Sequence, residues 1–349
     1  MFDLNISHTQ KPLRALTISA HGALDRIEYR TDVPAPEPGP GECRVRILAA
    51  ALNHLDLYVV GGLPGVTITP QWVLGADAVG IREDTGERVV INPGISDGTC
   101  EYCRAGEQSL CVHFRLLGEH LPGTIADCVV VPTRNVLPIP DTVPVPEAAA
   151  FTLATLTAWR MLVNRANVRP DDVVLIQGIG GGVALAALQI CKHIGARVWV
   201  TSTSDEKLER ARALGAEETI NSRSTDVARE VRARTGKRGV DVVVDSVGEA
   251  TWPSSLGSLA KGARLVTCGA TTGPMVTTDE RKLFWNQWSI LGSTMGNDAE
   301  FASVVSELSR GNLFPPIDSV FDITDGRAAF ERLASAGQFG KIVIRVADS

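Results

Sequence analysis

The sequence predicts an α/β protein of two domains, the first rich in β-strands and the second built on a parallel sheet. Residues up to about 145 contain short alternating runs, such as 43–47, separated by Pro and Gly and without helical periodicity. After Glu147 apolar strands alternate with helical segments. The 349 residues also suffice for about two domains of roughly 150 residues each.

The first part is predicted to be all β. Its stretch 34–41 holds four prolines and two glycines, which is too stiff for a helix or a central strand. We therefore expect a surface loop there, leading into a strand over residues 42–49.

The second part is predicted to alternate between helices and strands. The expected helices cover 147–164, 183–194 and 205–214, and the expected strands cover 171–177, 197–201, 240–245, 264–268 and 289–291. Gly215 is the residue type that commonly follows the last turn of a helix. Apolar strands alternating with helices are typical of a doubly wound sheet, covered on both faces.

Composition excludes several partners. The 34 Lys and Arg against 40 Asp and Glu give a net charge of −6, which does not attract nucleic acid. No apolar run approaches the ~18 residues of a membrane helix, and residues 1–12 lack the apolar segment of a targeting signal. Three of the seven cysteines crowd into residues 100–111, unlike a disulfide framework. We expect a cytoplasmic protein that acts on a small molecule.

A glycine cluster separates the expected strand at 171–177 from the following helix. It comprises Gly178, Gly180, Gly181 and Gly182, followed by Val183 where G-x-G-x-x-G would have its third glycine. Glycines let the backbone approach a pyrophosphate, whose charge then lies at the helix N-terminus. A plain tight turn is the alternative, but the strand before and the helix after favour a dinucleotide site.

The end of the next strand selects the cofactor. NAD sites commonly have Asp or Glu there, whereas this chain has Ser202, Thr203 and Ser204. Their hydroxyls can donate to a 2′-phosphate, and Lys207 or Arg210 can add positive charge. The same serines can also cap the helix at 205–214, which is compatible with that role.

Two later residues complete the expected cofactor site. Asp245 ends the strand at 240–245, and Gly269 directly follows the strand at 264–268. Such positions lie at the carboxyl edge of a parallel sheet, where ligands bind. The cofactor expected from these residues is NADPH.

Several stretches together resemble the medium-chain dehydrogenase/reductase superfamily, which includes zinc alcohol dehydrogenases and zinc-free quinone oxidoreductases. The similar stretches are 38–42, 51–56, 74–77, 86–89, 158–159 and the glycine cluster. The resemblance extends over residues 13–346, with a shortened segment between Val79 and Gly86.

This resemblance implies a domain arrangement. A GroES-like β-rich catalytic domain would comprise residues 1–148 and 296–349, and a Rossmann dinucleotide-binding domain residues 149–295. The active site would lie in the cleft between the two domains. A homodimer is also implied, through pairing of the strand at 289–291 with its symmetry mate.

The resemblance also implies that the catalytic zinc is lost. Asn53, Ala76 and Leu153 match the three ligand positions, and these residues are a poor ligand or none at all. Leu55 replaces a proton-relaying hydroxyl. The string 53–56 looks closer to that of the zinc-free quinone oxidoreductases. An unusual metal site drawing on His54, Asp77 or His120 is the alternative.

Asn53, His54 and Asp56 are the candidate catalytic residues. His54 could bind the pyrophosphate, donate a proton, or only orient its loop. Asp56 and Asp77 would carry charge beside the lost metal position, where they could fix the local backbone or act as acid or base.

Asp97, Cys100, Cys103 and Cys111 reproduce the spacing of the family's structural zinc lobe, with Asp in place of the first cysteine. Zinc accepts a carboxylate oxygen beside thiolates, so we expect one structural zinc per chain. A vestigial lobe with free thiols is the alternative.

The function expected from these features is NADPH-dependent reduction of a quinone or an α,β-unsaturated carbonyl compound without catalytic zinc. Such acceptors delocalise the developing charge and need only modest activation. One alternative is an alcohol or carbonyl dehydrogenase that uses Asn53, His54 and bound water. Another is a catalytically idle NADPH-binding protein.

Overall fold

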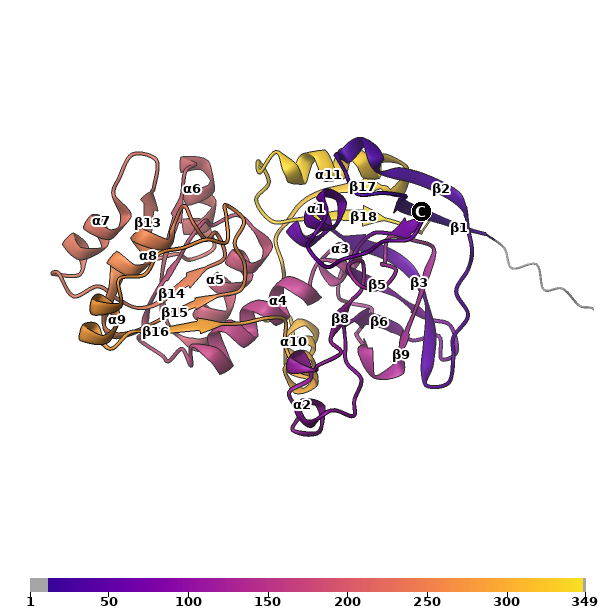
Figure 1. Cartoon of the computed structure of the whole chain (residues 1–349), viewed down its shortest axis with the longest axis horizontal. Helices are drawn as coiled ribbons and strands as arrows, with labels where there is room; N and C mark the ends of the chain where they lie inside the picture. Colours follow the sequence, from indigo (N-terminus) through magenta and orange to yellow (C-terminus); the bar gives the residue numbers. More distant parts are fainter. Residues whose placement is uncertain (1–11, 348–349) are drawn as a thin grey trace, which may run out of the picture.

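The computed structural model describes residues 12–347, so the expectation about residues 1–12 lies outside it except for Pro12. Figure 1 shows two bodies side by side, joined around α4 (Thr152–Trp159). We refer to them as the β-rich domain and the parallel-sheet domain. None of the helices within residues 12–347 is long and apolar enough to cross a membrane.

The β-rich domain is built mainly on a seven-stranded sheet. Its strands, in spatial order, are β10 (Val136–Pro138), β6 (Arg88–Ile91), β5 (Asp77–Arg82), β3 (Glu42–Ala51), β18 (Lys341–Arg345) and β17 (Ile317–Asp322), with β9 (Cys128–Pro132) also paired to β3. Two smaller sheets are formed by β2 (Glu28–Val33), β1 (Leu13–Ile18) and β4 (Trp72–Val73), and by β7 (Gly94–Ile95) and β8 (Arg115–Leu116). The loop at 34–41 leads into β3, as predicted.

The last strands of the chain complete this sheet. β18 pairs antiparallel with β3, with Val343 opposite Ala51, and β17 pairs parallel with β18. Figure 1 shows these yellow strands among the indigo strands of the N-terminal region, beneath α11 (Gly326–Ala334). The chain therefore returns from the parallel-sheet domain to the first one.

The parallel-sheet domain contains the predicted doubly wound sheet. Its strands are all parallel and lie in the order β13 (Glu218–Asn221), β12 (Arg197–Ser202), β11 (Val173–Ile176), β14 (Val240–Asp245), β15 (Leu259–Thr267) and β16 (Ser289–Gly292). Its helices are α5 (Gly182–Ile194), α6 (Asp205–Ala213), α7 (Val227–Arg234), α8 (Trp252–Ser258) and α9 (Glu280–Asn286). The strand order reverses beside β11, which places a ligand crevice at its carboxyl end.

The single helix expected at 147–164 is wrong. The chain forms α3 (Val145–Ala149), then α4, then a π-helical turn, η4 (Arg160–Arg165). The break at Ala150 places Phe151 fully inside the core, beside the alanines that precede it. α10 (Asp298–Ser309) packs against α4.

The all-β expectation for the first part is also wrong, at α1 (His54–Gly61) and the short α2 (Glu101–Arg104). α1 shows little helical apolar periodicity, because only Asp56, Val59 and Val60 of its eight residues are buried. Its start nevertheless carries a capping signal, Asn53 followed three residues later by Asp56. Single 3₁₀ turns are η1 (Leu24–Arg26), η2 (Gln108–Leu110), η3 (Thr133–Asn135) and η5 (Ile323–Asp325).

Candidate functional site

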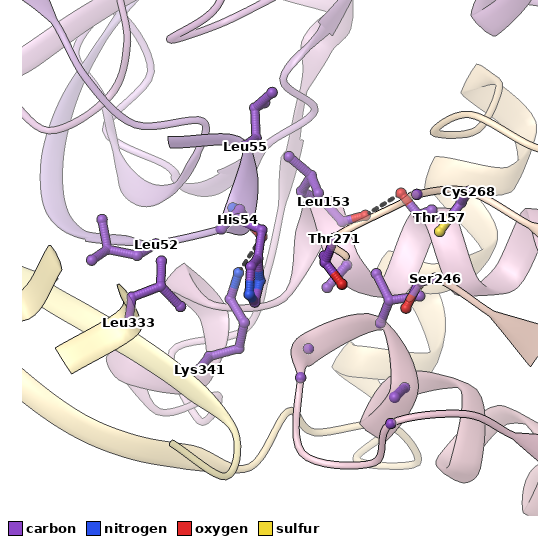
Figure 2. A pocket seen from close by; sticks show the side chains of 18 of the residues that line it. Leu52, His54, Leu55, Leu153, Thr157, Ser246, Cys268, Thr271, Leu333 and Lys341 are labelled. Carbon is purple, nitrogen blue, oxygen red and sulfur yellow. Dashed lines mark hydrogen bonds between the residues drawn. The ribbon is translucent and has the colours of Figure 1, made fainter. Parts of the chain in front are cut away.

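A cavity of about 490 Å³ lies between the two domains. Its walls come from the start of α1, the glycine turn before α5, and the segment that leads from α11 into β18. Figure 2 shows His54 and Lys341 together on one wall, with Ser246, Thr271 and Cys268 across from them. Three parts of the chain that are distant in sequence therefore form one site.

The predicted site residues divide into two groups. Those that line the cavity are Asn53, His54, Gly178, Gly181, Gly182, Val183, Lys207 and Gly269. Those outside its lining are Asp56, Gly180, Ser202, Thr203, Ser204 and Asp245. Asp77 also lies outside it.

The glycine turn fits a pyrophosphate. Gly178 and Gly180 have φ of +67° and +131°, values that favour glycine. A Cβ on Gly182 would lie 2.9 Å from the Cδ of Lys341, whereas a Cβ on Gly181 would meet no atom within 4 Å. The cradle beside Gly181 is thus open toward the cavity, where the backbone can approach a ligand.

The N-terminus of α5 completes this cradle. The N-cap residue is Gly181, and no side chain caps it, so the first N–H groups of the helix are available to an anion. The glycine turn is fixed to the neighbouring strand β12, because Gly178 donates its N–H to Thr201 Oγ1 at 3.1 Å.

At the end of β12, two hydroxyls accept backbone hydrogen bonds. Ser202 Oγ accepts from Ser204 N at 3.2 Å, and Ser204 Oγ caps α6 by accepting from Lys207 N at 3.3 Å. Neither hydroxyl donates a hydrogen bond to another group within residues 12–347. Asp205, the first acid after the strand, accepts instead from Asn221 Nδ2 at 2.7 Å.

Two cations of α6 face the C-terminal segment. Lys207 Nζ donates to Ala336 O at 2.7 Å, and Arg210 stacks its guanidinium 4.2 Å above the Phe339 ring. Burial, and then the charge of Arg332, lower the pKa of Lys207. Lys207 lines the cavity, whereas Arg210 is held against Phe339 and outside its lining.

Asp245 organises the loop that follows β14. Its fully buried carboxylate accepts from Val247 N at 2.9 Å, Gly248 N at 3.1 Å and Ser255 Oγ at 2.6 Å. Val247 lines the cavity. Asp245 therefore positions a cavity residue, and its predicted contact with a cofactor stays a prediction.

A buried polar cluster lies at the wall formed by α1 and β18, where Asn53, Leu153 and Lys341 line the cavity. Lys341 Nζ donates to Asn53 Oδ1 at 2.5 Å and to Asp77 Oδ2 at 3.0 Å. Asn53 Nδ2 donates to the same Asp77 oxygen at 3.0 Å, and Leu153 N donates to the other at 2.7 Å. All four polar groups of this Asn53–Asp77–Lys341–Leu153 cluster are therefore paired.

Sequence reasoning missed Lys341. The available signal was a lysine at the start of an apolar strand, Lys341-Ile-Val-Ile. A lysine buried at such a position needs a partner for its charge. The partner could not be named, because Asn53 lies 288 residues earlier in the chain.

His54 and Asp56 have different surroundings. His54 faces the cavity, and burial together with the charge of Lys341 lowers its pKa, which favours the neutral imidazole. Asp56 is fully enclosed and accepts from Asn53 N at 2.7 Å, so its carboxylate fixes the first turn of α1. His120 accepts from Leu116 N at 3.3 Å and does not line the cavity.

The four predicted ligands of the cysteine lobe, residues 97–111, come together. Side-chain donor atoms of Asp97, Cys100, Cys103 and Cys111 lie within 4.8 Å of one another. No other group of three His, Cys, Asp or Glu side chains in residues 12–347 is arranged to hold a metal. One carboxylate and three thiol groups around one point fit zinc.

The surroundings of the lobe also suit a bound cation. Asp97 N and His113 N point at Cys111 Sγ, at 3.3 and 3.4 Å, as donors to a thiolate do. His113 Nδ1 lies 2.8 Å from Asp97 Oδ2, and this contact holds the pKa of the Asp97 carboxyl well below its usual range.

A buried arginine ties the lobe to the rest of the molecule. Arg160 donates to Glu107 Oε2 at 2.6 Å and to Glu300 Oε2 at 2.8 Å. Glu107 belongs to the lobe, and Glu300 to the first turn of α10. The lobe is thus linked to η4 directly and to α10 through Arg160.

Two family descriptions match the chain. Residues 39–141 match the alcohol dehydrogenase GroES-like domain, and residues 182–310 match the zinc-binding dehydrogenase family.

Individual proteins match over most of the chain. A zinc-type alcohol dehydrogenase-like protein of Schizosaccharomyces pombe is 31% identical, over 94% of this chain and 97% of its own length. The crystal structure of an NAD-dependent alcohol dehydrogenase has 41% identity and a TM-score of 0.91, covering 96% of this chain and all of that one. A crotonyl-CoA carboxylase/reductase has 26% identity and a TM-score of 0.90, covering 97% of this chain and 89% of that one.

Proposed function

Because this chain belongs to the medium-chain dehydrogenase/reductase superfamily of oxidoreductases, we propose that it reduces a quinone or an α,β-unsaturated carbonyl compound with NADPH and without catalytic zinc. Bound NADPH would supply the hydride. The observation that carries the proposal is the Asn53–Asp77–Lys341–Leu153 cluster, because hydrogen bonds between protein groups connect two positions where zinc ligands would otherwise lie.

The cofactor part of the proposal is supported by the cradle. Gly181 and Val183 would lie against the pyrophosphate, at the uncapped N-terminus of α5. Ser202, Ser204 and Lys207 would face the 2′-phosphate, where the strand end lacks a carboxylate that could repel it.

The substrate part is supported by the chemistry of the walls. Leu55, Leu116 and Leu153 line the cavity, so an apolar acceptor fits beside the few polar groups. Negative charge that spreads into an enolate or a quinol needs less stabilisation than charge confined to one alkoxide oxygen. A set of hydrogen-bond donors is therefore adequate for such acceptors.

The second candidate is an alcohol or carbonyl dehydrogenase. It is favoured by the similarity to a structure named as an NAD-dependent alcohol dehydrogenase. The similarity to a crotonyl-CoA carboxylase/reductase favours the first candidate. We also propose one zinc in the cysteine lobe and a homodimer formed through β16.

The test is a panel of acceptors. NADPH oxidation is followed with quinones, enals, enones and saturated ketones at equal concentrations, in parallel with NADH. Turnover of enones or quinones without turnover of ketones supports the proposal. Turnover confined to ketones favours the second candidate, and NADPH binding without turnover of any acceptor would indicate a binding protein.

A further inference from the structure

We propose that the carboxylate of Glu119 selects the substrate. It binds acceptors that carry a hydroxyl or ammonium donor away from the reacting carbonyl group, and it disfavours acceptors that carry a carboxylate there. This inference rests on the proposed reductase function and narrows its substrate class. Glu119 is a specificity-determining residue in this proposal and takes no part in hydride transfer.

The first support is the character of the cavity wall. Among the described residues that line the cavity, Glu119 is the one acid. Its side chain is 16% exposed, and Leu55, Leu63 and Leu116 also line the cavity. A carboxylate that has lost most of its hydration needs hydrogen-bond donors in return.

The second support is that the protein supplies no such donor. The one basic atom within 4.0 Å of the Glu119 carboxylate in residues 12–347 is His120 Nε2, at 3.7 Å from Oε1. This distance is too long for a hydrogen bond. The structure shows no hydrogen bond between the Glu119 carboxylate and another described group. A donor carried by the ligand would therefore meet an unsatisfied acceptor.

The third support is the separation of Glu119 from the lysines of the cavity. Lys341 Nζ donates to Asp77 Oδ2 at 3.0 Å, and Lys207 Nζ donates to a backbone carbonyl at 2.7 Å. Burial raises the pKa of the Glu119 carboxyl, and the charge of His120 opposes this shift, whereas neither lysine contributes to it. Glu119 therefore lies apart from the glycine turn and its cations, and a cofactor bound there leaves it free for the acceptor.

The fourth support is a rigid backbone next to Glu119. Gly118 donates its N–H to Leu121 O at 2.8 Å, and its own carbonyl accepts from Trp72 Nε1 at 2.9 Å. Gly118 has a φ of +79°, and a Cβ there would lie 2.6 Å from Gly75 O, so only glycine fits. An acceptor group that is fixed before the ligand arrives loses little entropy on binding.

These features define the substrate class. A hydroxyl group can donate one hydrogen bond to the carboxylate, and an ammonium group adds opposite charge to its hydrogen bond. A substrate carboxylate would be repelled, and such repulsion contributes to selectivity as much as attraction does. The expected acceptor is therefore a largely apolar enone or quinone with one donor group.

The test uses a matched series of acceptors. The parent compound, 4-phenyl-3-buten-2-one, carries a methyl, hydroxymethyl, aminomethyl or carboxylate group at the meta or para position of the ring. The two positions vary the reach of the group, while the reacting enone stays the same. The kcat and KM values with NADPH are measured for the parent protein, Glu119→Leu and Glu119→Gln. The control is Glu331→Leu, at an exposed glutamate outside the cavity lining.

We expect the parent to prefer the better hydroxymethyl or aminomethyl isomer over the methyl compound by at least about tenfold in kcat/KM, as for one hydrogen bond to a charged group. The carboxylate compounds should be at least about tenfold worse than the methyl compound. In Glu119→Leu the four substituents should differ by less than about threefold. Glu119→Gln should keep a preference for the hydroxyl group, because its amide oxygen still accepts, and should lose the preference for the ammonium group.

These changes should appear in KM, with kcat for the methyl compound unchanged within about threefold in both variants. Glu331→Leu should behave like the parent. A preference for the aminomethyl compound alone would identify an ammonium group as the recognised donor, and a preference for both compounds would identify donors in general. Either preference supports the proposal if Glu119→Leu abolishes it.

A second measurement does not depend on turnover. Isothermal titration calorimetry gives the dissociation constants of the correspondingly substituted 4-phenyl-2-butanones, with and without NADP⁺. These saturated ketones are the products of the enone series. Their affinities should follow the same order in the parent and lose that order in Glu119→Leu.

The outcomes separate the two proposals. Equal kcat/KM values for the methyl, hydroxymethyl and aminomethyl acceptors in the parent overturn the role of Glu119, and so does a preference that persists in Glu119→Leu. A kcat that falls alike for every acceptor in both variants also overturns it, because Glu119 would then act in the reaction itself. A parent that turns over no acceptor contradicts the proposed function, while the dissociation constants still report on Glu119.

Discussion

The carboxylate of Asp56 accepts a 2.7 Å hydrogen bond from the backbone N–H of Asn53, directly behind the cavity wall. Asp56 is 1% exposed, and burial raises the pKa of its carboxyl from 3.8 to about 7. The folded state therefore binds this proton more tightly than the unfolded state does. The resulting stabilisation is complete below about pH 4 and is lost as the pH rises to about 7.

We expect Asp56→Asn to reduce this pH dependence. Between pH 5 and pH 7.5 the parent should lose about 2 kcal/mol more free energy of unfolding than the variant does. Urea denaturation of both proteins at the two pH values measures the difference. Parallel pH profiles would show that Asp56 is ionised in the folded protein at neutral pH.

Gly181→Ala should weaken NADPH binding at least about tenfold without unfolding the protein. The added methyl group meets no protein atom within 4 Å, and the φ of −80° at this position suits alanine. The methyl group would occupy the space of the pyrophosphate. Gly180→Val is a poorer probe, because the φ of +131° there strains any side chain.

Fluorescence titration with NADPH measures the affinity of Gly181→Ala. Gly61→Ala, at a second open position of the chain, is the control and should bind like the parent. Unchanged NADPH affinity in Gly181→Ala would contradict the prediction that the cofactor binds at the glycine turn.

We expect the parent to prefer NADPH over NADH by at least about tenfold, or about 1.4 kcal/mol. In the proposed complex, Lys207 and the hydroxyls of Ser202 and Ser204 would lie around the 2′-phosphate. Ser202→Asp should shift the preference toward NADH, because a carboxylate repels the phosphate and accepts the 2′-hydroxyl. The kcat/KM values with NADPH and with NADH, measured for the parent and for Ser202→Asp, test this prediction. Equal values in the parent, or no shift in the variant, would mean that another part of the chain selects the cofactor.

Elemental analysis after dialysis should find about one zinc per chain. Cys103→Ser should lose the metal and unfold at a lower temperature, because the lobe anchors Glu107 to the buried Arg160. Cys43→Ala, a buried cysteine outside the lobe, should keep its zinc. Two zinc ions per chain would indicate a metal in the cleft as well, and none would indicate that the lobe folds by packing alone.

Light scattering at micromolar concentration should give the mass of two chains. β16 is an edge strand of its sheet, and Phe284 and Trp285 on the preceding α9 are 66% and 73% exposed. An open edge beside apolar side chains is a surface that a second copy can cover. Leu291→Lys should shift the protein toward the monomer, and a monomeric parent would contradict the prediction.

Much of the parallel-sheet domain could be predicted because its signals are local. The strand predicted at 240–245 is β14, and the glycine cluster lies between β11 and α5 as predicted. Each of these features depends on neighbours within a few residues. The four donors of the cysteine lobe also lie within fifteen residues of one another, and they converge in the structure.

Other features depend on contacts that the sequence does not reveal. Lys341 was not predicted because its partners, Asn53 and Asp77, precede it by 288 and 264 residues. The break between α3 and α4 coincides with the fully buried Phe151, and helix propensity does not encode such burial. α1 was not predicted because only Asp56, Val59 and Val60 of its eight residues are buried, which leaves little apolar periodicity. Its local signal is the capping pair Asn53 and Asp56.

The pairing of β3 with β18 has a consequence for biosynthesis. β9 and β18 share one side of β3, β9 pairing with residues 42–46 and β18 with residues 49–51. Every strand of the parallel sheet has been synthesised once residue 292 is added, whereas the β-rich sheet lacks its strand β18 until residue 345. A chain that grows from its N-terminus can therefore fold its second domain before it completes its first. Lys341 reaches Asn53 only at the end of this process, so a chain stalled before residue 341 would have the parallel sheet with its glycine turn but not the hydrogen bond between Lys341 and Asn53.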